Sequence, residues 1–100
     1  MNNDLIITIV NRGHADKVME AARAKGATGG TVLNGRGTAG EVENFFGISI
    51  QSEKEIVMIV VDHDARRGIM EEISEKAGIK TVAQGVMFSL PVEESIGLSQ

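Results

Sequence analysis

Short apolar runs alternate with helical patterns along the chain. Two continuous runs, LIITIV at 5–10 and IVMIVV at 56–61, are rich in β-branched residues, and runs of this length are typical of buried strands. A helical pattern follows each run, closed by a lysine and a glycine as helix C-termini often are. Apolar residues recur at helical spacing at Ala15, Val18, Met19 and Ala22, and again at Ile69, Met70, Ile73 and Ala77.

The two strand–helix units form an internal duplication. They superpose without a gap, so that Leu5 falls on Ile56 and Lys25 on Lys76. Each unit ends in a further predicted strand, GTVLN at 30–34 and GVMFSL at 85–90. The order strand, helix, strand, repeated twice, predicts an α+β fold of the ferredoxin-like type. We expect a four-stranded antiparallel sheet with two helices on one face.

The predicted central strands are apolar on both faces, whereas the helices cover only one. A sheet that is apolar on both sides needs cover on both sides. We therefore expect a second copy of the chain to cover the open face, in a closed homo-oligomer. The alternative is that the segment NFFGISIQ at 44–51 folds over that face.

Composition narrows the function classes. The 100 residues, 42% of them hydrophobic, suffice for a single domain spanning 1–100, and the absence of cysteine excludes disulfides and thiolate metal sites. A net charge of -4 with scattered basic residues argues against nucleic-acid binding. The start MNNDLIITIVNRG has neither the pattern of a signal peptide nor that of a membrane span. We expect a cytoplasmic protein without membrane insertion.

Five of the chain's 12 glycines lie in GGTVLNGRGTAG at 29–40. Its end has the form G-x-G-x-x-G, but EVENFF at 41–46 offers at most six helical residues, too few for a dinucleotide-binding helix. Glu41 stands where a phosphate-binding loop would need lysine. What remains is a turn rich in N–H donors, in which Arg36 and Thr38 add a charge and a hydroxyl for an anion. A hairpin loop without a ligand is the alternative.

Three blocks of the sequence, GATGGTVLNGRGT, KEIVMIVV and GVMFSLPVEE, follow one another over nearly the whole chain. Together they resemble the P-II nitrogen-regulatory signalling family and its P-II-like relatives. The resemblance implies a ferredoxin-like homotrimer with its sheets lining the centre, and adenine nucleotides or related effectors in clefts between subunits. It also implies a loop after the second strand that engages a partner enzyme or membrane transporter.

The resemblance further implies an effector site, with no cofactor required. Thr31 would touch adenine, Gly35, Arg36, Gly37 and Thr38 would wrap the phosphates, Lys54 would bind phosphate, and Gln84 and Gly85 would form a late phosphate-facing turn. Where nucleotide binders of the family carry Gly-Asp-Gly-Lys, this chain reads AQGV at 83–86 and lacks a carboxylate and a cation. AMP or ADP is therefore easier to accommodate than ATP with magnesium.

The predicted loop 36–54 also departs from the family. Its part from Gly40 to Lys54 is shorter than the family's target-binding loop, and because the chain has no tyrosine, uridylylation of a loop tyrosine is excluded. Phe45, Phe46 and Ile48 suit a partner-docking element. Alternatively, they pack over the sheet edge of their own oligomer.

We expect no catalytic residue and no metal site, and hence not an enzyme. In VDHDAR at 61–66, three adjacent polar residues do not converge on one ion, and Asp62 or Asp64 is expected to cap a helix. Asn11 occupies the corresponding corner of the first unit. His14 is expected to be exposed to solvent.

Two other function classes stay open. One is a binding module for a metal ion or a non-nucleotide metabolite, similar to the trimeric divalent-cation tolerance proteins. The other is an acyl-phosphate hydrolase that would use Arg12 at the end of the first strand.

Overall fold

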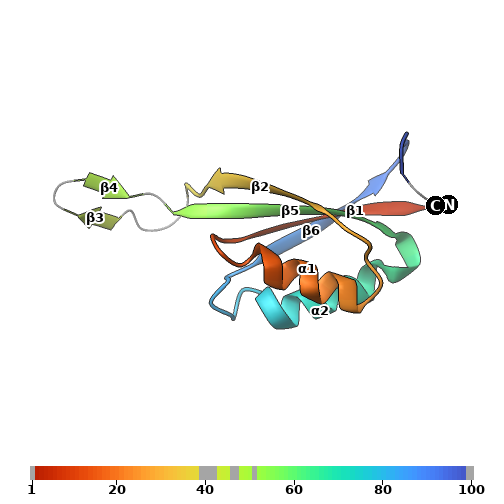
Figure 1. Ribbon diagram of the computed structural model, residues 1–100, viewed down its shortest axis with the longest axis horizontal. Coiled ribbons are helices and arrows are strands. Elements are labelled where there is room, and N and C mark those ends of the chain that lie inside the picture. The colour runs from red at the N-terminus through yellow and green to blue at the C-terminus, as the bar shows by residue number, and fades with distance from the viewer. Residues whose placement is uncertain (1, 39–42, 46–47, 51, 99–100) are drawn as a thin grey trace.

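The computed structural model describes residues 2–38, 43–45, 48–50 and 52–98. Its elements follow the expected order, with a short hairpin inserted between the two units (Figure 1). The elements are β1 (Asn3–Asn11), α1 (Ala15–Ala24), β2 (Thr31–Arg36), β3 (Glu43–Phe45), β4 (Ile48–Ile50), β5 (Glu53–Asp62), α2 (His63–Ala77) and β6 (Val86–Val92).

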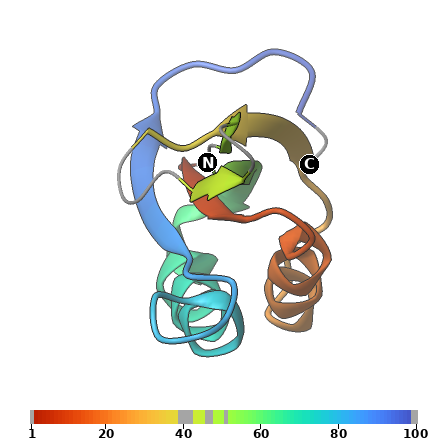
Figure 2. The same cartoon turned by 90° about the vertical axis from the view of Figure 1, so that its left-hand side faces the viewer.

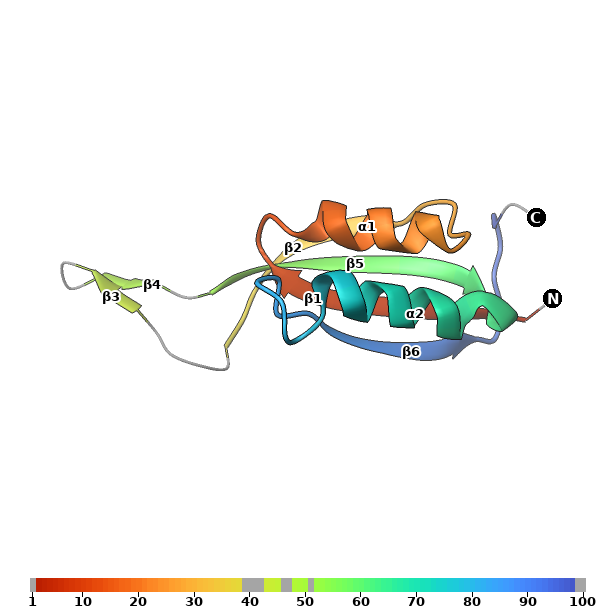
Figure 3. The ribbon, with the colours of Figure 1, turned by 90° about the horizontal axis from the view of Figure 1, so that it is seen from below.

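Four strands form one antiparallel sheet in the order β2-β5-β1-β6, and both helices lie on the same face of it (Figure 3). The two central strands, β1 and β5, contain the two apolar runs. They pair along their whole lengths, from Asn3 opposite Asp62 to Asn11 opposite Lys54. The α+β ferredoxin-like fold predicted from the duplication is confirmed.

The core lies between the sheet and the two helices. Along β1, buried and half-buried residues alternate strictly, as expected for a strand with one face toward a core. The largest fully buried apolar side chains come from both central strands and both helices: Ile6, Val10, Val18, Val57, Ile59, Ile69 and Ile73. Within the described ranges, neither helix combines the length and the apolar character that a membrane crossing requires.

The helix N-termini are not capped as expected. α1 begins at Ala15, well past Asn11, and α2 begins directly after Asp62; the N-cap side chain of neither helix makes a capping hydrogen bond. In α1 the cap comes from another strand, because Oε1 of Glu55 on β5 accepts hydrogen bonds from the N–H groups of Gly13 (2.9 Å) and Ala15 (3.0 Å). A carboxylate from β5 thus satisfies donors that a helix start leaves open.

The second face of the sheet is apolar and carries no helix among the described residues (Figure 2). Opposite residues in an antiparallel pair share a face, so the register assigns the members of this open face: Leu5, Ile7, Ile9, Leu33, Ile56, Met58, Val60, Val86, Phe88 and Leu90. Phe88 is 45% exposed and Leu90 47%. An apolar patch of this extent marks an interaction surface.

The strands β3 and β4 pair antiparallel, with Glu43 opposite Ile50, and extend beyond the end of the four-stranded sheet (Figure 1). The alternative that this segment folds over the open face is therefore wrong for its described part. The stretch 41–46, for which the sequence allows at most six helical residues, is extended at 43–45. Phe46 and the side chains of Phe45 and Ile48, on which the docking interpretation depends, lie outside the described residues.

Candidate functional site

Three neighbouring strands place polar or small residues in one row, near the start of the β3–β4 hairpin. Asn11 on β1 lies opposite Lys54 on β5, and Lys54 lies opposite Gly35 on β2. Alternate residues of a strand share a face, so Lys54 lies on the same face as Ile56 and Met58. This row therefore belongs to the open face. The row therefore puts an ammonium group at the end of an uncovered apolar surface.

Lys54 is linked to the loop between α2 and β6 through Asn11. Nζ of Lys54 donates to Oδ1 of Asn11 at 2.6 Å. Nδ2 of Asn11 donates to the carbonyl oxygen of Val82 at 3.1 Å and to Oε1 of Gln84 at 3.3 Å. Gly85 follows directly and its N–H donates to Ala77 at the end of α2. The fold thus gathers Lys54, Gln84 and Gly85 at one end of the sheet.

The glycines after Leu33 allow close packing against β5. A Cβ atom at Gly35 would lie 2.7 Å from Cδ1 of Ile56, and one at Gly37 would lie 2.9 Å from Cε of Lys54. The N–H of Gly37 donates to the carbonyl oxygen of Ser52 at 2.7 Å, which prolongs the β2–β5 pairing. These two glycines therefore keep the space beside Lys54 free of side chains. Arg36 and Thr38, on either side of Gly37, are exposed.

Thr31 lies at the other end of β2, opposite Met58. At about 3.3 Å per residue it stands roughly 13 Å from Gly35 along the strand. It lines a cavity of about 490 Å³ together with Thr28, Asp62 and Leu98. Within one chain, the residue expected to touch adenine and those expected to bind phosphate therefore form two separate groups.

The structure gives Arg12 a partner and places His14 differently from the expectation. Arg12 forms an ion pair with Glu53, and both side chains are exposed. The guanidinium therefore has a carboxylate partner, in an exposed ion pair of the kind that contributes little to stability. His14, expected to be exposed, is half-buried, and its Nδ1 is a buried atom without a hydrogen-bond partner.

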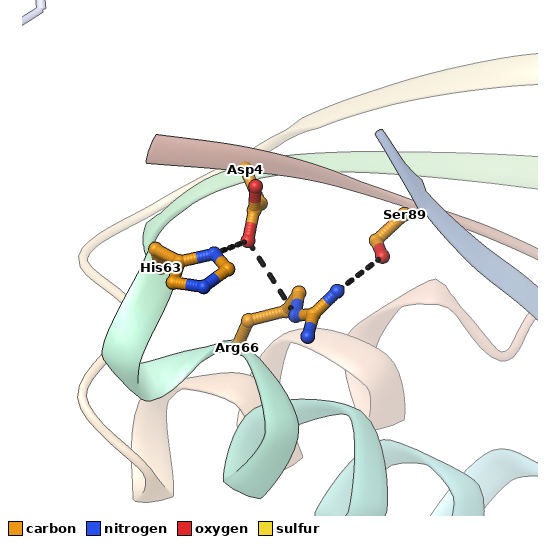
Figure 4. Close-up of polar contacts among 4 residues, drawn as sticks. All are labelled: Asp4, His63, Arg66 and Ser89. Atoms are coloured by element: carbon orange, nitrogen blue, oxygen red, sulfur yellow. Dashed lines mark hydrogen bonds and ion pairs between the residues drawn. The ribbon is translucent and has the colours of Figure 1, made fainter. Parts of the chain in front are cut away.

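A separate polar cluster lies on the helix-facing side of the sheet (Figure 4). Asp4 on β1 is only 5% exposed, and its Oδ2 lies 2.7 Å from Nδ1 of His63 and 3.4 Å from Nε of Arg66. Nη1 of Arg66 in turn donates to Oγ of Ser89 on β6 at 3.3 Å. The guanidinium bridges the carboxylate and the hydroxyl, whereas the imidazole contacts the carboxylate. The cluster ties the first turn of α2 to two strands.

The sequence VDHDAR forms the junction between β5 and α2. Asp62 is the N-cap residue by position and Asp64 lies in the first turn, where its negative charge complements the helix dipole. His63 contacts Asp4 rather than either neighbour. Among the described residues, no three histidine or carboxylate side chains gather in a way that could hold a metal ion.

The sequence interpretation did not identify the contacts that Asn11 and Glu55 make. Both act on partners more than 35 residues away along the chain: Asn11 on Lys54 and Glu55 on Gly13. The signal that could have found them is the register of the two central strands. Once Asn3 is placed opposite Asp62, Asn11 must stand beside Lys54.

Comparison with known proteins identifies one family. Residues 3–100 match the family model of Nitrogen regulatory protein P-II. The match therefore covers both duplicated units, the row around Lys54 and the cavity beside Thr31. No individual curated protein gives a significant match.

Proposed function

Because the chain belongs to the P-II nitrogen regulatory protein family, whose members are regulatory signalling proteins rather than enzymes, we propose that it binds a small anionic effector and regulates a partner protein. The effector is an adenine nucleotide, held in clefts between the subunits of a homotrimer. The loop 36–54 transmits its binding to the partner, an enzyme or a membrane transporter, in the cytoplasm.

The observation that carries this proposal is the environment of Lys54. Its ammonium contacts a neutral amide at 2.6 Å, so its positive charge is not neutralised by that partner. Gly35 on β2 and Gly37 directly after it leave the neighbouring positions without side chains. A cation next to a glycine-rich backbone suits a phosphate group, which forms stronger hydrogen bonds with charged donors than a neutral acceptor does.

The open face supports a site built between copies. A ligand that contacts both Thr31 and Lys54 of one chain would have to span most of β2, whereas two copies can bring Thr31 of one against Lys54 of another. The apolar residues between these two groups, such as Leu33 and Ile56, favour burial against another sheet. Closed cyclic assembly gives each copy the same cleft.

The effector would act on the loop through the turn at 35–38. Phosphate contacts with this turn favour one arrangement of the loop that follows it. A ligand shifts such an equilibrium by its differential affinity for the ordered and less ordered states. Gly40 to Lys54, which carries β3 and β4, is the segment that would present this change to a partner.

Isothermal titration calorimetry with AMP, ADP and ATP, with and without magnesium, tests the proposal. We expect AMP or ADP to bind without magnesium. Lys54→Ala should weaken binding about tenfold or more, because a hydrogen bond to a charged group contributes roughly 1.5–3 kcal/mol. Lys76→Ala, which removes an exposed lysine at the end of α2, should leave the affinity unchanged.

The same titrations distinguish the competing class. If no adenine nucleotide produces heat while a divalent metal ion does, a metal-binding module replaces the nucleotide sensor. Equal losses of affinity in Lys54→Ala and Lys76→Ala would show that binding depends on overall charge and not on the row around Lys54.

A further inference from the structure

Asn11 occupies the centre of the contacts at the hairpin end of the sheet. Its side chain accepts from Lys54 and donates to both Val82 and Gln84. Its backbone N–H also donates to the carbonyl oxygen of Ala83 at 2.9 Å. Every polar atom of the Asn11 amide side chain thus has a partner, on β5 or in the loop 78–85.

Hydrogen bonds within the loop 78–85 and from Asn11 hold this loop in its conformation. Gln84 has φ 50°, the only positive φ of a non-glycine residue among those described. Such a conformation costs about 1–2 kcal/mol and persists where surrounding contacts fix it. Its N–H donates to Thr81 at 3.0 Å, and its side chain accepts from Asn11. Losing the Asn11 contact therefore removes one of the restraints on this residue.

Two parts of this loop differ in burial: the base, formed by Ala83 and Gly85, and the outer part, which contains Ile79 and Val82. Ala83 is fully buried and Gly85 is fixed to Ala77 by a backbone hydrogen bond of 2.9 Å. Ile79 and Val82, in contrast, are 64% and 71% exposed. A rearrangement of the Asn11 side chain would consequently act on the outer residues, while the base stays in place.

An anion at Lys54 competes with Asn11 for the position of the ammonium group. The ammonium has three protons and donates one of them to Asn11, and an anionic acceptor attracts the cation more strongly than a neutral amide does. When the ammonium turns toward the anion, Oδ1 of Asn11 loses its 2.6 Å donor. Oδ1 then accepts from another donor, and a rotation of the amide toward that donor changes its contacts to Val82 and Gln84.

We propose that Asn11 is a positioning residue that holds Lys54 in place and couples the occupancy of the Lys54 site to the loop 78–85. The inference rests on the proposed effector site. It adds a second responding segment, distinct from the loop 36–54. It also explains why a neutral amide, rather than a carboxylate, stands beside Lys54: a carboxylate would neutralise the cation that the effector needs.

The first test needs no ligand. Hydrogen exchange of the amides in 78–85 is measured for the wild type, Lys54→Ala, Asn11→Ala and the double variant. We expect each single substitution to accelerate exchange in this loop about threefold or more, and the double variant to exchange no faster than Asn11→Ala, because the two residues act in series. Unchanged exchange in Lys54→Ala, or additive effects in the double variant, would overturn the coupling.

The second test uses ADP as the probe. Asn11→Asp places a carboxylate beside the ammonium, so the affinity for ADP should fall about tenfold, since charge-assisted pairs are roughly twice as strong as neutral ones, while the melting temperature is maintained or raised. Asn2→Asp adds the same charge on an exposed residue at the other end of β1 and should bind ADP like the wild type. Wild-type affinity in Asn11→Asp would refute the positioning role. Absence of ADP binding in the wild type would instead refute the proposed function, and the ligand-free exchange cycle would still decide the coupling.

Discussion

Replacing Phe88 by aspartate should dissociate the proposed homotrimer without unfolding the chain. Phe88 lies on the edge strand β6, opposite Ile7, and exposes 45% of its surface on the open face. For a side chain of about 200 Å² this is roughly 90 Å², and at about 25 cal/mol per Å² its burial contributes about 2 kcal/mol per copy. Three copies together give about 6 kcal/mol, or roughly four orders of magnitude in the association constant. Burying three carboxylates adds a further cost.

Sedimentation velocity over a range of protein concentrations measures the effect, with circular dichroism as the check on folding. The control is Val32→Asp. Val32 lies on the other edge strand, β2, with the same 45% exposure, but it is opposite Val57 and therefore on the helix-facing side. We expect Val32→Asp to retain the assembly that Phe88→Asp loses. A Phe88→Asp protein that still sediments as a trimer, or equal dissociation of both variants, would refute the assignment of the open face as the interface.

Three further substitutions test the local structure by urea denaturation. Asp4→Asn should lower the free energy of unfolding by about 2 kcal/mol, less than the roughly 3–5 kcal/mol for a fully buried ion pair because the Arg66 side chain is 36% exposed; an unchanged value would mean that the cluster is not structural. Gly85→Ala should destabilise severely, since its Cβ would lie 2.1 Å from a backbone oxygen of α2, whereas at Gly37 it meets the flexible end of a side chain; equal effects of alanine at the two positions would contradict this contrast. Glu55→Gln should cost about 1 kcal/mol through the weakened cap of α1, and a more stable variant would contradict that role.

The hydrophobic pattern was enough to predict the fold because each central strand is a continuous apolar run. LIITIV and IVMIVV lie within β1 and β5, and the helical spacing at Ile69 and Ile73 identifies residues that are fully buried. Both helices also end at the predicted positions, with C-cap residues Lys25 and Gly78. These features depend on local periodicity, which a sequence shows directly.

The helix caps and the site network could not be predicted in the same way. Asn11 and Asp62 occupy equivalent positions in the two units, which predicts equivalent helix caps. The two helices begin differently, however, because α2 starts directly after β5, whereas α1 starts only at Ala15. Glu55 accepts hydrogen bonds from the N–H groups at the start of α1 and so supplies its cap. Contacts of this kind depend on which residues the sheet places opposite one another, and that register follows from tertiary packing.

The proposed effector residues follow from the family resemblance alone, and their arrangement depends on distance along β2. The sequence places Thr31 and Gly35 close together in number, yet an extended strand holds them about 13 Å apart. Lys54, Gln84 and Gly85, in contrast, are far apart in sequence and meet at one end of the sheet. Extended structure thus divides a short motif, while strand pairing gathers distant residues.

The most direct test of the central claim is a native mass spectrum of the protein purified gently from cells. The account predicts a single species of three times the 10.7 kDa chain mass, carrying additional mass from a bound nucleotide that is lost on Lys54→Ala. A folded species of one chain mass at micromolar concentration, without any bound small molecule, would contradict it.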